Sequence, residues 1–326
     1  MDQRHVNSVG GGLNGSVFHN FFDRVVSLEN LLAAWREFRR GKRAKSDVQR
    51  FEFDLEENLF SLQETLLDRT YAHQTYQSFY VCDPKLRHIH KATVRDRVLH
   101  QAVFRVLYPI FDRAFIFDSY SCRMDKGTHR AVSRLEVFVH KASRNHRRTV
   151  FALKCDVRKF FDSVDQDILL ALVRRKVRDE DALWIVEAIV RSFETRQGKG
   201  LPLGNVTSQL FANIYLNELD QFIKHNLKVK FYIRYCDDFV ILHTSRDHLG
   251  ALAERINSFL HYRLCLQLHA DKIIIGKHTQ GIDFLGYVVL PYYRVLRTKT
   301  KQRILRKLNE RKLSLRQRII TETSFN

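Results

Sequence analysis

The sequence lacks several features that would assign it to a common class. It has no apolar run near the roughly 18 residues that a membrane-spanning helix needs. No apolar signal segment follows residues 1–5, so we expect no membrane partner. The five cysteines are far apart without a Cys-x-x-Cys pair, which argues against a disulfide framework or a zinc site. This pattern favours a reducing compartment and predicts buried thiols.

Acidic residues are also few relative to basic ones. The 326 residues include 55 Lys and Arg against 36 Asp and Glu, a formal net charge of +19. The 44% hydrophobic and 28% charged content is typical of a soluble globular protein with two or three subdomains. The positive excess indicates a polyanionic partner, and nucleic acid fits better than a membrane surface.

Two adjacent carboxylates, Asp237 and Asp238, lie between β-prone apolar runs at 231–233 and 239–242. Such runs predict two strands, so the pair should lie at the turn of a hairpin. One interpretation is an ordinary polar turn. The other is a pair of carboxylates that needs a compensating cation, and Mg²⁺ is suitable because hard cations prefer carboxylate oxygens.

A buried-type strand at 150–157 carries a third carboxylate, Asp156. If this strand neighbours the hairpin, Asp156, Asp237 and Asp238 could hold two ions about 3.5–4 Å apart, the spacing of two-metal phosphoryl transfer. One ion would activate a 3′-hydroxyl, and the other would neutralise the leaving oxygens. Lys85 and Arg87, near the tip of a hairpin predicted at 76–92, would suit a triphosphate.

Periodicity predicts the remaining elements. Residues 1–20 are expected to form a flexible arm, and 198–205 a loop. The tail at 292–326 is basic and partly amphipathic. Helices are predicted at 27–35 with Ser27 as N-cap, 50–68, 98–111, 129–143, 165–195, 208–219 and 247–263, a turn at 160–164, a strand at 272–276 and a hairpin at 283–290.

These motifs, in this order over about residues 79–290, resemble those of reverse transcriptases of the bacterial retroelement kind. Tyr235-Cys236-Asp237-Asp238 is the hallmark tetrapeptide, and Asp156 with Phe160-Phe161 matches the first catalytic strand. The resemblance implies an α+β right-hand polymerase with fingers, an antiparallel palm sheet backed by helices, and a short helical thumb. The implied domains are an N-terminal arm and helices (1–70), fingers and the start of the palm (71–150), palm with a fingers insertion at about 170–205 (151–291), and a basic helical thumb that is short for a complete one (292–326).

The resemblance also implies an enzyme, an RNA-directed DNA polymerase with two Mg²⁺ ions and Mn²⁺ as a substitute. Lys272 is implied to protonate the leaving pyrophosphate. Phe161 is implied to exclude the sugar 2′-hydroxyl, whereas core packing is the alternative for Phe160 and Phe161. The implied metal ligands are Asp156, Val157, Asp237 and Asp238, and the implied substrate-binding residues are Lys85, Arg87, Phe161, Leu203, Gly204, Ser208, Gln209 and Tyr235.

The loop at 201–209 departs from most reverse transcriptases, which have Gln-Gly followed by Ser-Pro. Leu203-Gly204 and Ser208-Gln209 are similar to enzymes of diversity-generating retroelements, which misincorporate opposite template adenine. We hypothesise that Leu203, with Arg87, governs such errors, because leucine cannot form the hydrogen bond that glutamine could. The alternative is that Leu203 only packs under the nucleotide.

The implied partners are template RNA, an RNA/DNA duplex, dNTPs and a small basic helical accessory protein. The implied location is the cytoplasm, in a bacterial, archaeal or phage-encoded system. A defence-associated or group II intron-like reverse transcriptase would keep the same chemistry. A non-enzymatic alternative is an RNA-binding protein on a polymerase scaffold, which is disfavoured because the three aspartates and Lys272 are all present.

Overall fold

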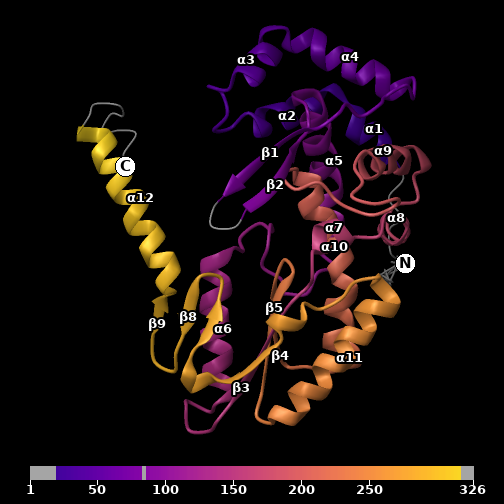
Figure 1. The fold of residues 1–326 in the computed structure, drawn as a ribbon. Coiled ribbons are helices and arrows are strands. Elements are labelled where there is room, and N and C mark those ends of the chain that lie inside the picture. The colour runs from indigo at the N-terminus through magenta and orange to yellow at the C-terminus, as the bar shows by residue number, and fades with distance from the viewer. Residues whose placement is uncertain (1–19, 83–85, 317–326) are drawn as a thin grey trace, which may run out of the picture.

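Helices and antiparallel strands alternate in the computed structural model, which describes residues 20–82 and 86–316 (Figure 1). This confirms the predicted α+β class. The residues that the structure describes form three sheets, in the orders β1-β2, β4-β5-β3-β6 and β7-β8-β9. The strands are β1 (Gln77–Cys82), β2 (Leu86–Lys91), β3 (Phe151–Asp156), β4 (Phe231–Tyr235), β5 (Asp238–His243), β6 (Ile274–Lys277), β7 (Ile282–Phe284), β8 (Tyr287–Val289) and β9 (Arg294–Leu296).

Helix α2 begins where its capping residue predicts. Ser27 accepts a hydrogen bond from the Asn30 N–H at the start of α2, which confirms the predicted N-cap. None of the described helices is long and apolar enough to cross a membrane. The helices are α1 (Phe21–Val26), α2 (Leu28–Phe38), α3 (Ser46–Phe53), α4 (Leu55–Leu67), α5 (Val94–Asp112), α6 (Thr128–Ala142), α7 (Phe160–Ser163), α8 (Gln166–Arg174), α9 (Glu180–Arg191), α10 (Val206–Gln221), α11 (Arg246–Leu264) and α12 (Thr298–Arg316).

Two stretches that were predicted as single helices each form two helices, so the predicted lengths were wrong. The stretch at 50–68 is broken at Asp54, which has the non-helical angles φ −110° and ψ 45°. Phe53, beside the break, is 88% exposed, and Phe60 in α4 is 55% exposed. The stretch at 165–195 is broken before Asp179, whose side chain caps α9. The turn predicted at 160–164 contains the short helix α7.

The expectation of buried thiols was also wrong. Cys82, Cys122 and Cys265 are exposed, Cys236 is partly buried and Cys155 is buried. All five are free cysteines, as the spacing predicted. The predicted arm lies outside the described residues, apart from Asn20 at its end.

Apolar side chains bury both faces of the four-stranded sheet. On one face, Tyr232, Phe239 and Ile241 belong to the core that also contains α5, α8, α10 and α11. On the other face, Ile233 and Val240 pack with α6. Because successive strand residues point to opposite faces, this two-sided burial explains the continuous apolar run of β5.

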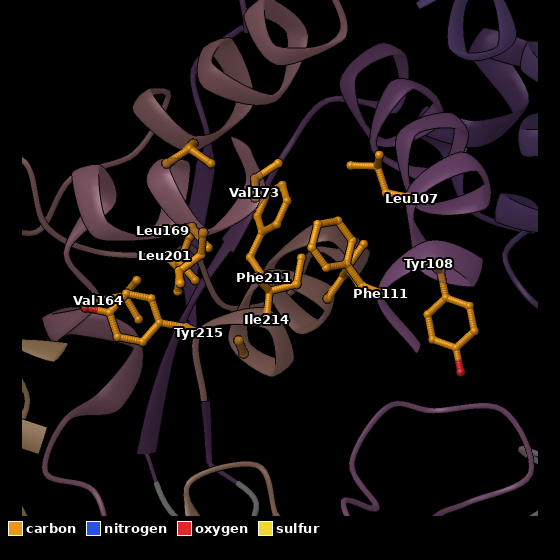
Figure 2. Packing of buried hydrophobic residues seen from close by; sticks show 14 of the residues in the cluster. Leu107, Tyr108, Phe111, Val164, Leu169, Val173, Leu201, Phe211, Ile214 and Tyr215 are labelled. Carbon is orange, nitrogen blue, oxygen red and sulfur yellow. The ribbon is translucent and has the colours of Figure 1, made fainter. Parts of the chain in front are cut away.

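Helix α10 lies at the centre of the larger core. Figure 2 shows Phe211, Ile214 and Tyr215 of α10 among buried side chains from neighbouring segments. Each such buried side chain stabilises the fold by about 1.5–3 kcal/mol through loss of apolar surface from water. This packing holds α10 rigidly behind the β4–β5 hairpin. Its partners in Figure 2 include Leu107, Phe111, Val164, Leu169, Val173 and Leu201.

The predicted helix in the basic tail is present as α12. It follows β9 and extends away from the rest of the molecule (Figure 1). Ile304, Leu305 and Leu308 lie on neighbouring positions of α12 and are exposed. The helix therefore presents an apolar stripe within a strongly basic surface.

Candidate active site

Strand register brings the three predicted carboxylates to one end of the four-stranded sheet. Asp156, the last residue of β3, pairs with Asp238, the first residue of β5. Tyr235 also pairs with Asp238, so the β4–β5 hairpin turns through Cys236 and Asp237. The Asp237 carbonyl accepts a hydrogen bond from the Val157 N–H at 3.2 Å. The expectation that neighbouring strands join Asp156 to the Asp pair is therefore confirmed.

A buried arginine behind this turn fixes its shape. Cys236 has φ +55°, an uncommon angle for a residue other than glycine. The Cys236 carbonyl accepts a hydrogen bond from Arg234 Nη1 at 3.0 Å. Arg234 is fully buried, and its Nη2 lies 2.6 Å from Oδ2 of the equally buried Asp220 on α10. The packed helix thus holds the turn through one ion pair.

This arginine also joins a larger buried polar network. Its Nη2 donates to Ser119 Oγ at 3.0 Å, and its Nη1 donates to Asn213 Oδ1 at 3.3 Å. The Tyr232 hydroxyl donates to Asp220 Oδ1 at 2.6 Å. The sequence analysis missed this network, although a charged residue inside the apolar run of β4 was a usable signal.

Burial and mutual repulsion raise the pKa of two of the three carboxyl groups. Burial raises the pKa of Asp237, and the neighbouring Asp156 carboxylate raises it further. Burial raises the pKa of Asp238 to about 6; Lys154 opposes this rise, whereas Asp237 and Asp156 add to it. A bound divalent cation would relieve this repulsion, and the three carboxylates are the hard oxygen donors that Mg²⁺ prefers. Lys154 is a further residue that the sequence analysis missed.

Lys272 lies against the same group of carboxylates. Its Nζ is 2.6 Å from Asp156 Oδ1. Among the described residues, no group of three or more His, Cys, Asp or Glu is arranged to hold a metal ion. The donors therefore fit Mg²⁺ in chemistry but are not pre-assembled as a cage. A cation at Asp156 competes with the Lys272 ammonium for the same carboxylate.

A large cleft of about 1010 Å³ lies between the β1–β2 hairpin and the end of β3. Two predicted substrate-binding residues, Arg87 and Leu203, line it together. Arg158 and Lys159 also line it, and they follow Asp156, the last residue of β3, by two and three positions. The sequence analysis missed these cations, although their position directly after Val157 was a signal. The basic residues of the lining are Arg87, His88, His90, Arg158, Lys159, Arg196, Lys199 and His261.

The Leu203-Gly204 segment is joined to the hairpin strand β2. The Leu203 carbonyl accepts a hydrogen bond from the His90 N–H at 3.0 Å. Gly204 has φ +117°, and a Cβ there would lie 3.1 Å from Ile89 Cγ2. Asn205 Nδ2 donates to the His90 carbonyl at 3.4 Å. A close backbone approach therefore requires the glycine and couples the loop to the hairpin.

The other predicted residues divide between core and surface. Phe160 is buried, which confirms that one of the two phenylalanines packs in the core, and Phe161 is half-buried. Ser208 is buried at the start of α10, whereas Gln209 is exposed. The Tyr235 hydroxyl accepts a hydrogen bond from Thr128 at 3.3 Å. Lys85 lies outside the described residues.

Comparison with known proteins supplies independent evidence. Residues 83–289 match the model of a family described as reverse transcriptase (RNA-dependent DNA polymerase). Protein YkfC of Escherichia coli K12 is 26% identical over 266 residues, covering 69% of each chain. The group II intron-encoded protein LtrA of Lactococcus lactis is 23% identical over 320 residues, covering 76% of this chain but 51% of LtrA. The chain thus spans about half the length of that relative.

Solved structures show a similar fold at low sequence identity. The apo telomerase of Candida tropicalis has a TM-score of 0.51 and 11% identity, covering 70% of this chain and 49% of the telomerase. The same telomerase with a fragment of telomeric RNA also gives a TM-score of 0.51. At this identity the likeness concerns the fold alone, a palm with fingers.

Proposed function

Because the chain belongs to the reverse transcriptase family of RNA-dependent DNA polymerases, we propose that it copies a template RNA into complementary DNA. The observation that carries this proposal is the strand register that joins Asp156 to Asp238 beside Asp237. In-line nucleotidyl transfer needs mainly positioning and charge neutralisation, and clustered carboxylates beside a basic cleft can provide both. Template RNA, its DNA duplex and dNTPs are the proposed partners.

The residues present define how the site would work. When bound at Asp156, Asp237, Asp238 and the Val157 carbonyl, Mg²⁺, or Mn²⁺ in its place, would neutralise charge and lower the pKa of the attacking hydroxyl. Arg87, which lines the cleft with Arg158 and Lys159, would hold the triphosphate together with Lys85. Phe161 would exclude a 2′-hydroxyl, and Lys272 would give its proton to the leaving pyrophosphate.

We also propose the domain limits and the remaining contacts. Residues 71–150 would form the fingers and the start of the palm, residues 151–291 the palm with a fingers insertion at about 170–205, and the basic thumb would begin at 292. Tyr235, Ser208 and Gln209 would support the substrate, with Ser208 acting from within α10 since it is buried. A small basic helical accessory protein and a cytoplasmic location belong to the same proposal.

The finer proposal is that the enzyme is the error-prone reverse transcriptase of a diversity-generating retroelement. It is supported by Leu203, which lines the same cleft as Arg87 and accepts a hydrogen bond from His90 of β2. A leucine there offers the nucleotide no hydrogen bond, so selection by fixed geometry would weaken. Sequencing of cDNA made from a defined RNA would test this, because errors spread evenly over all template bases would contradict it.

A group II intron-like reverse transcriptase is the second candidate. It is favoured by the match to LtrA, which is a group II intron-encoded protein. The chemistry would be unchanged, but copying would be accurate at adenine. The same cDNA sequencing separates the two candidates.

Primer extension on poly-rA/oligo-dT tests the shared activity. We expect Mg²⁺-dependent DNA synthesis that Asp237→Ala abolishes. Asp247→Ala is the matched control, since Asp247 is an exposed aspartate at the start of α11. A wild-type protein that is inactive with Mg²⁺ and with Mn²⁺, alone or with an accessory protein, would contradict the proposal.

A further inference from the structure

The turn between α6 and β3, residues 144–148, has an unusual backbone. Three consecutive residues, Arg144, Asn145 and His146, have φ values of +50°, +59° and +63°. Hydrogen bonds hold this conformation: the Asn145 N–H donates to the His140 carbonyl at 2.9 Å, and the Arg148 N–H donates to the Ser143 carbonyl at 3.0 Å. We call residues 144–148 the distal turn. Its side chains are thus displayed from a fixed scaffold.

The distal turn carries uncompensated positive charge. Arg144, Arg147 and Arg148 are all exposed. Within the described part of the chain, none of these three guanidinium groups forms an ion pair. Many other arginines do, such as Arg134 with Asp118 at 2.8 Å. Since a free guanidinium fork matches phosphate oxygens, this cluster favours an anionic ligand.

Exposed aromatic rings lie beside His146 of the same turn. Tyr292 is 81% exposed and Tyr293 61% exposed, in the segment between β8 and β9. The Tyr292 ring centroid is 4.7 Å from that of His146 in the distal turn. His140, His146 and both tyrosines line a hollow of about 370 Å³. Aromatic faces of this kind stack on unpaired nucleobases.

This surface is separate from the catalytic carboxylates. Val150, which follows the distal turn, accepts a hydrogen bond from the His278 N–H at 2.9 Å at the start of β3. Asp156 is at the other end of β3, roughly 17 Å from Phe151 at the usual rise of a strand. In Figure 1 the lower end of α6, where the turn begins, lies far from the β1–β2 hairpin. The cleft lining and this surface share no residue.

We propose that the distal turn, with Tyr292 and Tyr293, binds a single-stranded segment of the template RNA outside the stretch being copied. The arginines would contact phosphates, and the aromatic hollow would hold an unstacked base. This inference rests on the proposed function, since it presupposes an RNA template. Single-stranded DNA has the same phosphates and base faces, so the test includes both.

The test compares two triple variants of the full chain. Arg144→Ala/Arg147→Ala/Arg148→Ala removes the charge of the distal turn. Lys176→Ala/Arg178→Ala/Arg255→Ala removes the same charge from exposed residues that form no ion pair among the described residues. Fluorescence anisotropy measures binding of a labelled single-stranded RNA, and separately of DNA, over a range of salt concentrations.

We expect the distal-turn variant to bind RNA at least tenfold more weakly than the control variant. Loss of three phosphate contacts should also reduce the slope of log K against log salt by about 2. Tyr292→Ala should weaken binding without changing that slope. Weakening for RNA alone, or for RNA and DNA together, supports the proposal, whereas weakening for DNA alone contradicts it.

Extension of a short oligo-rA/oligo-dT duplex serves as the folding check, and both variants should match the wild type. Equal RNA binding by the two variants would overturn the proposal that the distal turn binds RNA. The turn would then face solvent or a protein partner. A wild-type chain that binds RNA through the distal turn but never extends a primer would contradict the proposed function instead. The two failures are therefore distinguishable.

Discussion

Arg234 shows how one residue connects the core to the chemistry. Its guanidinium holds the Cys236 carbonyl beside Asp237 and Asp238, the proposed catalytic residues, while it pairs with Asp220. Burial of an ion pair costs desolvation energy, and the attraction between well-placed charges only offsets that cost. Such a pair is therefore weak evidence for stability by itself. We interpret it as a device that fixes the turn in one conformation.

Removal of one partner should be costly. Arg234→Ala leaves Asp220 charged and buried, and should lower the free energy of unfolding by about 3–5 kcal/mol. Arg191→Ala is the control, because its pair with Asp167 is exposed and should cost at most about 1 kcal/mol. Urea unfolding measures both. A similar small effect for the two variants would show that the buried pair does not support the fold.

Asp238 should make stability depend on pH in the absence of metal ions. Its folded-state pKa of about 6 is above the ordinary value of about 3.9. The folded state therefore favours the protonated carboxyl group of Asp238. Its contribution to the free energy of unfolding is complete below pH 4 and is lost as pH rises through 6. Asp238→Asn should thus become more stable than the wild type above pH 6. Thermal unfolding with EDTA from pH 4 to 8 measures this, and a pH-independent difference would contradict it.

Leu203 is the residue on which the proposal of adenine-directed errors depends. Leu203→Gln restores a side chain that can hydrogen-bond in the cleft, and should reduce misincorporation opposite adenine several-fold. Leu86→Gln is the control, since Leu86 also lines the cleft. Sequenced cDNA measures the errors. Unchanged adenine errors in Leu203→Gln would leave Leu203 with a packing role only.

At the scale of elements, the loop carrying Leu203 depends on its contact with β2. Gly204→Ala introduces a Cβ at φ +117° and 3.1 Å from Ile89, which should cost about 1–3 kcal/mol of stability. Gly250→Ala is the opposite control, because Gly250 lies in α11 with open space around it and should gain about 0.4–1 kcal/mol. Denaturant unfolding measures the change in the free energy of unfolding for both variants, and we expect opposite signs. Equal effects would contradict the close approach.

Sequence patterns predicted the elements that bring the three carboxylates to one end of the sheet. The β4–β5 hairpin and β3 were predictable because their apolar runs end at carboxylates, and register then brings Asp156 to Asp238. The break at Asp54 was not predictable, since helical periodicity continues through it. Asp220 was not predicted as a partner of Arg234 either, because only packing brings α10 behind β4.

At the scale of the whole molecule, the charge of +19 corresponds to more than one surface. The cleft beside β3 and the distal turn both expose cations, at opposite ends of the same strand. Helix α12 adds a third basic element. A polymerase that holds one long polyanion at several places would use such a distribution, and its affinity should fall steeply with salt.

The central claim is that Asp156, Asp237 and Asp238 form the polymerase site. The most direct measurement is incorporation of a single dNTP on an RNA template, with Mg²⁺ varied, in the wild type and in Asp156→Asn, Asp237→Asn and Asp238→Asn. We expect Mg²⁺-dependent incorporation by the wild type and background levels for each variant, with folding retained. Wild-type rates in any one of the folded variants would contradict it.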